Sequence, residues 1–406
     1  MGRVRHPLFS PVWHLLFTFL IQIPTMRRLT VIYLLLLVLL FSACGGSHGK
    51  NDRTATSLDT LYHPQYASGF EIFRSGKSSV LHITNPWQGA DSVSQWIFLA
   101  RDGEQAPADF DGVILQAPIR KAVCMSSSYV AFLEALGADS VIRAISGTGF
   151  IFSERIRQRI AAGEITETGF DNSLNFEQLV ALQPDVIFLY GITGENALTA
   201  KLNELGLKTI YIGDYVENNP LGRAEWVTLF GEFVDRGERA RTLFDSIRTE
   251  YNQAKALVAD VEQRPEVMLN APWQDSWFVP GDRSYMVRLI EDAGGNYACR
   301  GVDSDQSRPI STETAFVTAS KADYWLSPGT ATNLAELRAM NTRFESIKPV
   351  REKHVYNNNA RTTPSGGSDF WESGALYPDR TLKDMIHILH PELLPDHTLF
   401  YFRQLK

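Results

Sequence analysis

Hydrophobic residues recur along the chain in two patterns, and each pattern predicts one type of element. Short apolar runs that end at Gly or Ser predict buried strands. These runs are 121–125, 141–145, 186–190 and 209–212. Between them, residues 129–136 place apolar side chains at helical spacing and stop at Gly137, a typical helix end. Strands that alternate with helices predict a mainly parallel sheet, with a cleft formed by the loops that follow the strands.

The longest helical pattern covers residues 236–262, which lack Gly and Pro after Gly237. Its apolar residues are Ala240, Leu243, Phe244, Ile247, Tyr251, Ala254, Leu257, Val258 and Val261. At 1.5 Å per residue the pattern extends over about 39 Å, which is too long for a crossover within one sheet. It predicts a rigid connection between two lobes. After Pro265 the alternation of strands and helices resumes.

The segment before the first lobe has a different pattern. Residues 70–100 contain the β-rich runs GFEIF, SSVLHITN and SVSQWIFLA, separated by Gly and Asn-Pro turns. The chain is therefore expected to be an α/β protein of two Rossmann-like lobes joined by a long rigid interlobe helix, with a small β-rich N-terminal extension. The expected parts are a signal segment at 1–43, a tether at 44–60, a β-rich leader at 61–110, a first α/β lobe at 111–235, the interlobe helix at 236–262 and a second α/β lobe at 263–406.

Residues 31–44 read VIYLLLLVLLFSAC and follow Arg27 and Arg28. A basic start, a short apolar run and a small residue before a cysteine predict a secretory signal. The order resembles the lipobox of bacterial lipoproteins, in which the cysteine, here Cys44, is acylated and becomes the mature N-terminus. The alternative is an uncleaved membrane anchor. In both cases the chain after Cys44 works outside the cytoplasm. With Cys44 acylated, the protein is expected in the periplasm, anchored by lipid to the cell membrane.

A second apolar stretch precedes this signal. Residues 7–25 are broken by three prolines, and two consecutive export signals serve no purpose. We therefore expect translation to start at Met26. A genuine N-terminal membrane helix is the alternative.

Composition and residue spacing exclude some classes of partner and site. Residues 1–43 hold four of the 39 Lys and Arg and none of the 46 Asp and Glu, so the remaining chain carries 35 basic and 46 acidic residues, a net charge of −11. Nucleic acid as a partner is not expected, because phosphate binding needs a basic stripe. No CxxC, HExxH or HxH spacing occurs, so no protein-made metal site is expected. A disulfide between Cys124 and Cys299 is conceivable but not favoured.

Two segments carry a resemblance to a known family. Residues 175–190 read NFEQLVALQPDVIFLY, and residues 120–147 read RKAVCMSSSYVAFLEALGADSVIRAISG. Together with the long helix and the lipobox, they resemble the class III substrate-binding proteins of ABC importers. The likeness extends from about residue 120 to the C-terminus. It implies a monomer without a resident cofactor that binds iron–siderophore complexes, haem or cobalamin and delivers them to a permease dimer driven by an ATPase.

Two glutamates occupy matching positions in this pattern. Glu177 lies two residues after Asn175, and Glu313 lies two residues after Ser311; both preceding residues are good N-caps. In the family resembled, one such glutamate per lobe pairs with arginines of the permease, so these two are the expected docking residues. The alternative is that a first-turn acid simply favours the helix dipole, by about 0.3–1 kcal/mol.

The ligand is expected between the lobes, in contact with aromatic and arginine side chains from the loops. Flat aromatic surfaces suit a large macrocycle or a catecholate, and Arg can pair with propionates or an anionic chelate. The candidate ligand-binding residues are Tyr129, Phe150, Phe152, Trp273, Trp277, Arg308, Arg361 and Trp371. The alternative for each aromatic residue is a place in the core. Because the chelator coordinates the metal, no clustered protein ligands are needed.

Other local signals favour structural roles. Gly147-x-Gly149 lacks the third glycine of a nucleotide site, residues 126–128 lack a GxSxG elbow, and His387 and His390 suit dipole capping. Trp87 is either a lid or part of the leader core. We expect an iron–siderophore or haem carrier without catalytic residues, with cobalamin as the alternative cargo. The competing functions are an extracytoplasmic chelate-processing enzyme and a surface receptor without a permease.

Overall fold

The computed structural model describes residues 58–170, 173–191, 197–273 and 276–406. The expected signal segment, the start at Met26, Cys44 and nearly all of the tether lie outside the described residues. Within the described ranges, no helix combines the length and the apolar character needed to cross a bilayer.

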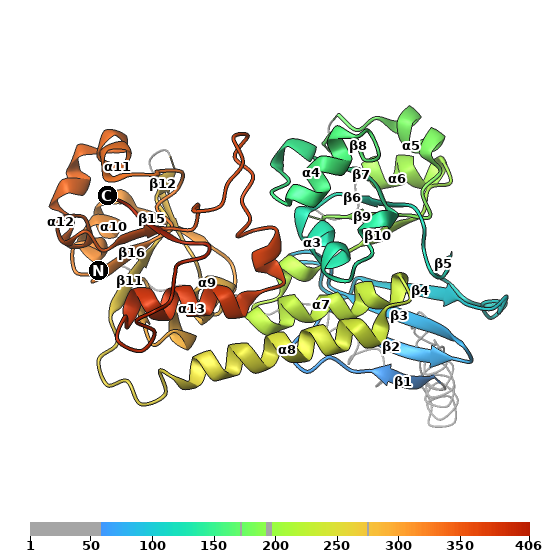
Figure 1. Cartoon of the computed structure of the whole chain (residues 1–406), viewed down its shortest axis with the longest axis horizontal. Helices are drawn as coiled ribbons and strands as arrows, with labels where there is room; N and C mark the ends of the chain where they lie inside the picture. Colours follow the sequence, from blue (N-terminus) through green and yellow to red (C-terminus); the bar gives the residue numbers. More distant parts are fainter. Residues whose placement is uncertain (1–57, 171–172, 192–196, 274–275) are drawn as a thin grey trace, which may run out of the picture. The chain divides into compact units, whose positions relative to one another are not determined.

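The leader forms a sheet of its own, drawn in blue to blue-green in Figure 1. Its strands are β1 (Asp59–Tyr62), β2 (Phe70–Ser75), β3 (Ser78–Thr84), β4 (Ser94–Ala100) and β5 (Val113–Gln116). They pair in sequence order, antiparallel from β1 to β4 and parallel between β4 and β5. The sheet therefore extends to Gln116, beyond the predicted boundary at residue 110, because β5 pairs with β4 rather than with the first lobe.

The first lobe contains a sheet in which every strand pair is parallel. Its strands are β6 (Ala122–Cys124), β7 (Ile142–Ile145), β8 (Thr166–Glu167), β9 (Val186–Leu189) and β10 (Thr209–Tyr211), in the order β10-β9-β6-β7-β8. Its helices are α3 (Ser127–Ala135), α4 (Glu154–Ala161), α5 (Phe176–Leu182) and α6 (Ala197–Glu204), with 3-10 helices η2 (Asp139–Val141), η3 (Thr148–Phe150) and η4 (Asp214–Val216). The order of the sheet reverses between β9 and β6, as in Rossmann folds, where ligands bind beside such a point.

The second lobe has a separate sheet in the order β14-β11-β16-β17-β18. Its strands are β11 (Glu266–Leu269), β14 (Asn296–Tyr297), β16 (Tyr324–Leu326), β17 (Val355–Asn357) and β18 (Arg403–Gln404); only β18 is antiparallel to its neighbour. A small antiparallel sheet adds β12 (Pro272–Trp273), β13 (Ser276–Val279) and β15 (Arg308–Ser311). The helices are α9 (Tyr285–Asp292), α10 (Thr312–Ala319), α11 (Leu334–Met340), α12 (Lys348–Glu352) and α13 (Pro378–Leu389), with 3-10 helices η5 (Thr342–Ser346) and η6 (Ser373–Ala375). In the part of the chain that is described, no strand of this sheet pairs with the first lobe, so the predicted pair of lobes is confirmed.

Helices α7 (Pro220–Phe233) and α8 (Gly237–Ala256) lie between the two sheets in the chain. Helix α8 packs against α7 of the first lobe and α13 of the second, as Figure 1 shows. It ends at Ala256, six residues before the predicted end, so it is about 30 Å long rather than about 39 Å. The apolar pattern continues past Ala256 because Val258 is buried against Gly294 of the second lobe, within a series of turns rather than a helix.

Buried carboxylates at α7 and the loop before it hold the leader sheet in place. Glu217 accepts hydrogen bonds from the backbone N–H groups of Ser68 (2.9 Å) and Gly69 (3.0 Å) and from Nε1 of Trp226 (3.1 Å). Glu225 accepts four hydrogen bonds, one from Tyr62 at the end of β1 and three from the segment between β1 and β2. The leader is therefore bound to the first lobe by satisfied polar contacts as well as by apolar packing.

A single apolar core cluster runs through these parts. It includes Phe70 and Leu81 of the leader, Phe188 of the first lobe, and Trp277 and Leu382 of the second. Close-packed interiors resist deformation. This continuity favours the predicted rigid connection between the two lobes.

Candidate docking and ligand site

The two matched glutamates lie on equivalent elements of the two lobes. Glu177 is in the first turn of α5, which leads into β9, and Glu313 is in the first turn of α10, which leads into β16. Both side chains are exposed. The predicted N-caps are confirmed: the side chain of Asn175 accepts from the N–H of Gln178 (3.0 Å), and that of Ser311 accepts from the N–H of Thr314 (3.2 Å).

The turn after each helix confirms that the positions are equivalent. The carboxylate of Asp185 accepts from the N–H of Lys121 (2.9 Å), and its own N–H donates to the Lys121 carbonyl (2.8 Å). Asp323 does the same with Glu266, at 2.8 and 2.7 Å. The unequal spacing from glutamate to aspartate, eight residues against ten, therefore does not change the arrangement. In α/β units the helix N-terminus lies near the carboxyl end of the strand that follows it, so each glutamate lies at the strand-end edge of its sheet.

Two loops that follow strand ends meet between the lobes. The first, which we call the seam loop, is residues 147–153 after β7; the second, which we call the strap, is residues 361–373 after β17. Oγ1 of Thr363 in the strap donates to the carbonyl of Gly149 (3.1 Å). A Cβ on Gly367 would lie 1.9 Å from the carbonyl oxygen of Phe150, so only glycine fits there. The lobes are thus joined directly at this point, as well as through α8.

Four of the predicted ligand residues are on these two loops: Phe150, Phe152, Arg361 and Trp371. Phe150 is 44% exposed and Trp371 48% exposed, so both offer aromatic surface to a ligand. The guanidinium of Arg361 lies 4.6 Å from the ring centre of Phe152 and pairs with Asp369 (2.6 Å). Arg361 and Phe152 therefore mainly contact each other and the loops, while Phe150 and Trp371 remain available.

The other predicted ligand residues are divided between surface and core. Trp273 at the end of β12 is 68% exposed, which fits a ligand contact. Arg308 is half-buried on β15. Phe170 was missed by sequence reasoning; it is 51% exposed, and its ring centre lies 6.1 Å from that of Phe150. Only Gly169 before it marks a loop, because β8 has two residues and gives no strand pattern.

The prediction that Tyr129 and Trp277 contact the ligand is wrong, because both side chains lie in the core. Tyr129 is fully buried, and its hydroxyl donates to the carbonyls of Leu189 and Ile212, each at 3.2 Å. Trp277 is fully buried, and its Nε1 donates to the carbonyl of Leu269 (2.9 Å). Both side chains lie in the core and bind backbone carbonyls at or next to the ends of strands, so neither is available to a ligand in this structure.

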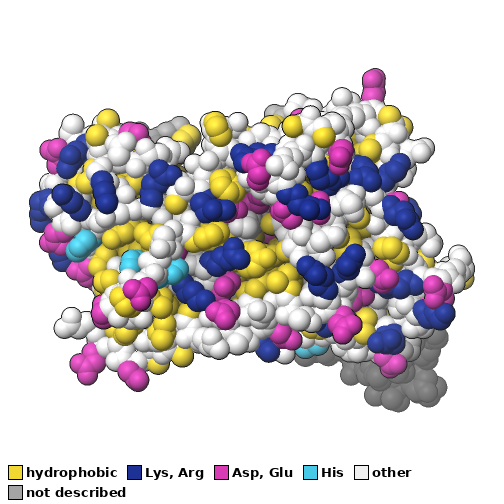
Figure 2. Space-filling view, viewed as in Figure 1, with side chains coloured by type: hydrophobic (Ala, Val, Ile, Leu, Met, Phe, Trp, Pro, Cys, Tyr) yellow, Lys and Arg dark blue, Asp and Glu magenta, His cyan; other side chains and the backbone are white. Residues whose placement is uncertain are grey.

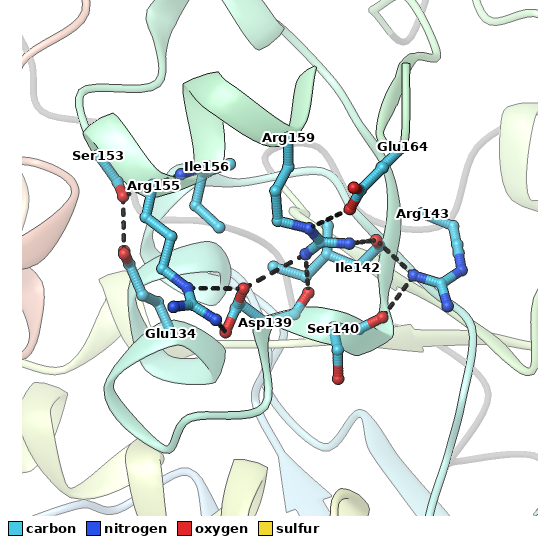
Figure 3. A network of polar contacts seen from close by, with 10 residues as sticks. All are labelled: Glu134, Asp139, Ser140, Ile142, Arg143, Ser153, Arg155, Ile156, Arg159 and Glu164. Carbon is cyan, nitrogen blue, oxygen red and sulfur yellow. Dashed lines mark hydrogen bonds and ion pairs between the residues drawn. The ribbon is translucent and has the colours of Figure 1, made fainter. Parts of the chain in front are cut away.

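A polar network fixes the base of the seam loop, as Figure 3 shows. Asp139 is buried and accepts from Arg155 (2.9 Å) and Arg159 (3.4 Å) of α4. Ser153, the N-cap of α4, donates from its hydroxyl to Glu134 of α3 (2.8 Å). On the face in view in Figure 2, basic side chains lie over this part of the first lobe with acidic ones between them. Helix α4 and the seam loop are therefore held firmly on the first lobe.

Trp87 belongs to the contact between the leader and the first lobe. It is 9% exposed, and its ring centre lies 4.9 Å from that of Tyr211. A polar cavity of about 250 Å³ lies beside it, between the leader loop 84–91, the first-lobe loop 213–218 and Asp305 and Gln306 of the second lobe. Of the two readings of Trp87, the structure favours the core over the lid.

Cysteines and histidines have structural surroundings. Cys124 and Cys299 are both buried and free, so the disulfide does not form. His387 bonds the carbonyl of Leu394 (2.8 Å), and His390 bonds that of Gly294 (3.1 Å). Over the residues that the structure covers, no group of three His, Cys, Asp or Glu side chains could hold a metal ion.

The fold and these contacts define a class: two α/β lobes with strand-end loops that meet at a seam and exposed aromatic side chains beside it. Residues 123–362 match the model of the family described as periplasmic binding protein. The chain belongs to this family, whose members bind solutes and are not enzymes.

The chain is also similar to several individual proteins. An uncharacterized lipoprotein of Methanocaldococcus jannaschii is 25% identical over 344 residues, which cover 79% of this chain and 80% of that protein. Among solved structures, a possible iron-binding (periplasmic solute-binding) protein from Staphylococcus epidermidis aligns with a TM-score of 0.53 and 16% identity, over 67% of this chain and 99% of that one. A periplasmic haem-binding protein from Pseudomonas aeruginosa aligns with a TM-score of 0.52 and 16% identity, over 67% and 93%.

Proposed function

We propose that this protein captures a metal chelate, an iron(III)–siderophore complex or haem, between its lobes and delivers it to an ABC permease dimer powered by an ATPase. It works in the periplasm, anchored to the membrane by a lipid on Cys44. The observation that carries the proposal is the pair of exposed glutamates at equivalent positions of the two lobes. Two exposed acids at equivalent positions of the two lobes suit docking onto a permease with two subunits, whereas a role in the helix dipole alone does not require them to match.

The nature of the cargo is supported by the exposed aromatic side chains and by the neighbours described as haem-binding and iron-binding. Large apolar rings offer area and stacking to a macrocycle or a catecholate. The chelator, rather than the protein, supplies the metal ligands.

The test is the absorption spectrum of full-length protein purified from its native host. Haem, ferric catecholates and corrinoids absorb differently, so a bound chelate identifies itself. A haem or ferric-siderophore band at one equivalent per chain is the expected result. A corrinoid band would show that the cargo is cobalamin instead. Protein that retains no chromophore and binds none of the three when they are added would refute the proposal.

Replacing Trp371 by alanine should weaken binding of that cargo about tenfold, because one stacking surface is lost. The side chain is 48% exposed, so the fold should tolerate the change. Leu257→Ala is the control, since this apolar side chain is 43% exposed outside the seam loop and the strap. Titration monitored by quenching of tryptophan fluorescence gives both affinities. Equal affinities for the two variants would show that Trp371 does not contact the cargo.

A further inference from the structure

The strap places one carboxylate of the second lobe against the backbone of the first. Glu372 is 2% exposed. Its Oε2 accepts from the N–H of Phe152 (2.7 Å), and its Oε1 accepts from the N–H of Ser153 (2.9 Å). Since Ser153 is the N-cap of α4, this carboxylate joins the strap to the start of a helix that belongs to the other lobe.

The charged groups around Glu372 are mostly acidic. Asp369, in the strap itself, and Glu134, on α3, both act on it through their negative charge. The nearby cations are engaged elsewhere: Arg361 pairs with Asp369, and Arg155 of α4 pairs with Asp139. Among the described residues, Glu372 forms no ion pair with a Lys, Arg or His side chain. Glu372 and Glu134 thus both accept hydrogen bonds from Ser153 at the start of α4, and the nearby carboxylate of Asp369 is buried as well.

This environment favours the neutral form of Glu372. Burial, together with the charges of Asp369 and Glu134, outweighs the two N–H donors and raises the pKa of Glu372 from 4.5 to about 7. If the strap lifted away, the side chain would return to water and to its ordinary pKa. The closed strap therefore binds the proton more tightly than the open one, and by linkage acid favours closure. Closure is strongest below the ordinary pKa and is lost as the pH rises through about 7.

We propose that the strap is a proton-controlled latch between the lobes, which holds the seam shut while Glu372 is protonated and loosens when this side chain ionises. The neighbouring contacts fit a latch that moves as a unit, because Thr363 and Gly367 meet the same seam loop. The inference concerns the two lobes alone and does not depend on which ligand they bind.

The latch is tested by amide hydrogen exchange of the peptide covering residues 148–156 in the full-length protein, from pH 5 to pH 8.5, corrected for the intrinsic pH dependence of exchange. Protection should fall about tenfold per pH unit up to about pH 7 and then level off. Protection that stays constant over this range, or that increases with pH, would overturn the proposal.

Variants assign the effect to Glu372. Glu372→Gln cannot ionise, so the pH dependence of the 148–156 peptide should disappear. Glu345→Gln changes an exposed acid of the same lobe and should leave it intact. Glu134→Gln removes one repelling charge, so the fall in protection should end at a lower pH than in the wild type. If Glu372→Gln does not fold, the Glu134→Gln shift decides the question: an unshifted curve contradicts the proposal.

Discussion

Replacing Glu177 and Glu313 together by arginine should abolish cargo uptake while leaving cargo binding unchanged. Under the proposed function, each glutamate meets an arginine of a permease subunit, so each reversal sets two like charges against each other. Like charges placed across an interface cost several kcal/mol, which corresponds to about a hundredfold or greater loss of docking affinity. Uptake should fall to the level of cells that lack the protein.

The fold should survive this change. Both side chains are exposed, and losing a first-turn acid costs about 0.3–1 kcal/mol per helix. Neither residue lies on the seam loop or the strap, so the affinity for cargo measured by titration should stay within about twofold of the wild type. This split between binding and uptake separates docking from an effect on the ligand site.

The matched control is Glu238→Arg combined with Glu262→Arg. Both residues are exposed acids, Glu238 also occupies a first helical turn, and the change in net charge is the same. Uptake through this double variant should remain close to the wild-type level. If the Glu177 and Glu313 reversals leave uptake intact, the protein does not dock through these positions, and a receptor without a permease becomes the better description.

The first-turn positions of Glu177 and Glu313 could be predicted because their signals are local. An N-cap such as Asn175 or Ser311 acts on an amide three residues away, so its effect can be read from a few consecutive letters. The alternation of strands and helices is equally local, which is why both lobes and the family likeness were visible in the sequence. The exact ends of the helices were harder to predict. For example, Val258 continues the apolar spacing of α8 although it lies beyond the helix and packs on the second lobe.

The ligand site depended on information that a single sequence does not contain. Trp273 and Trp277 lie four residues apart in one aromatic segment, yet one is 68% exposed and the other fully buried. Their difference is set by the pairing of β13 with β15 and by the carbonyl of Leu269. The partners of Glu372 lie about 220 residues away in the chain, so no pattern predicted that contact.

The contact between the leader sheet and the first lobe also joins residues that are far apart in the sequence. It leads to the prediction with the largest effect on stability. Replacing Glu225 by alanine should lower the free energy of unfolding by about 4 kcal/mol or more. The carboxylate is fully buried and accepts from the hydroxyl of Tyr62 (2.6 Å) and from the N–H groups of Gln65, Tyr66 and Ala67, each at 2.8 Å. Without it, three backbone donors and one hydroxyl lose their acceptor, and each such loss costs about 1–3 kcal/mol, less when water enters.

Tyr62→Phe provides the matched comparison. It removes one donor but leaves the carboxylate with three amide partners, so its cost should be about 1 kcal/mol. The midpoint of urea unfolding of the full chain measures both variants, and hydrogen exchange of residues 62–69 shows where the structure loosens. Exchange in this segment should accelerate strongly in Glu225→Ala and little in Tyr62→Phe. Equal midpoints for the two variants would mean that apolar packing alone holds the leader, and that the buried glutamate only fills a polar space between leader and lobe.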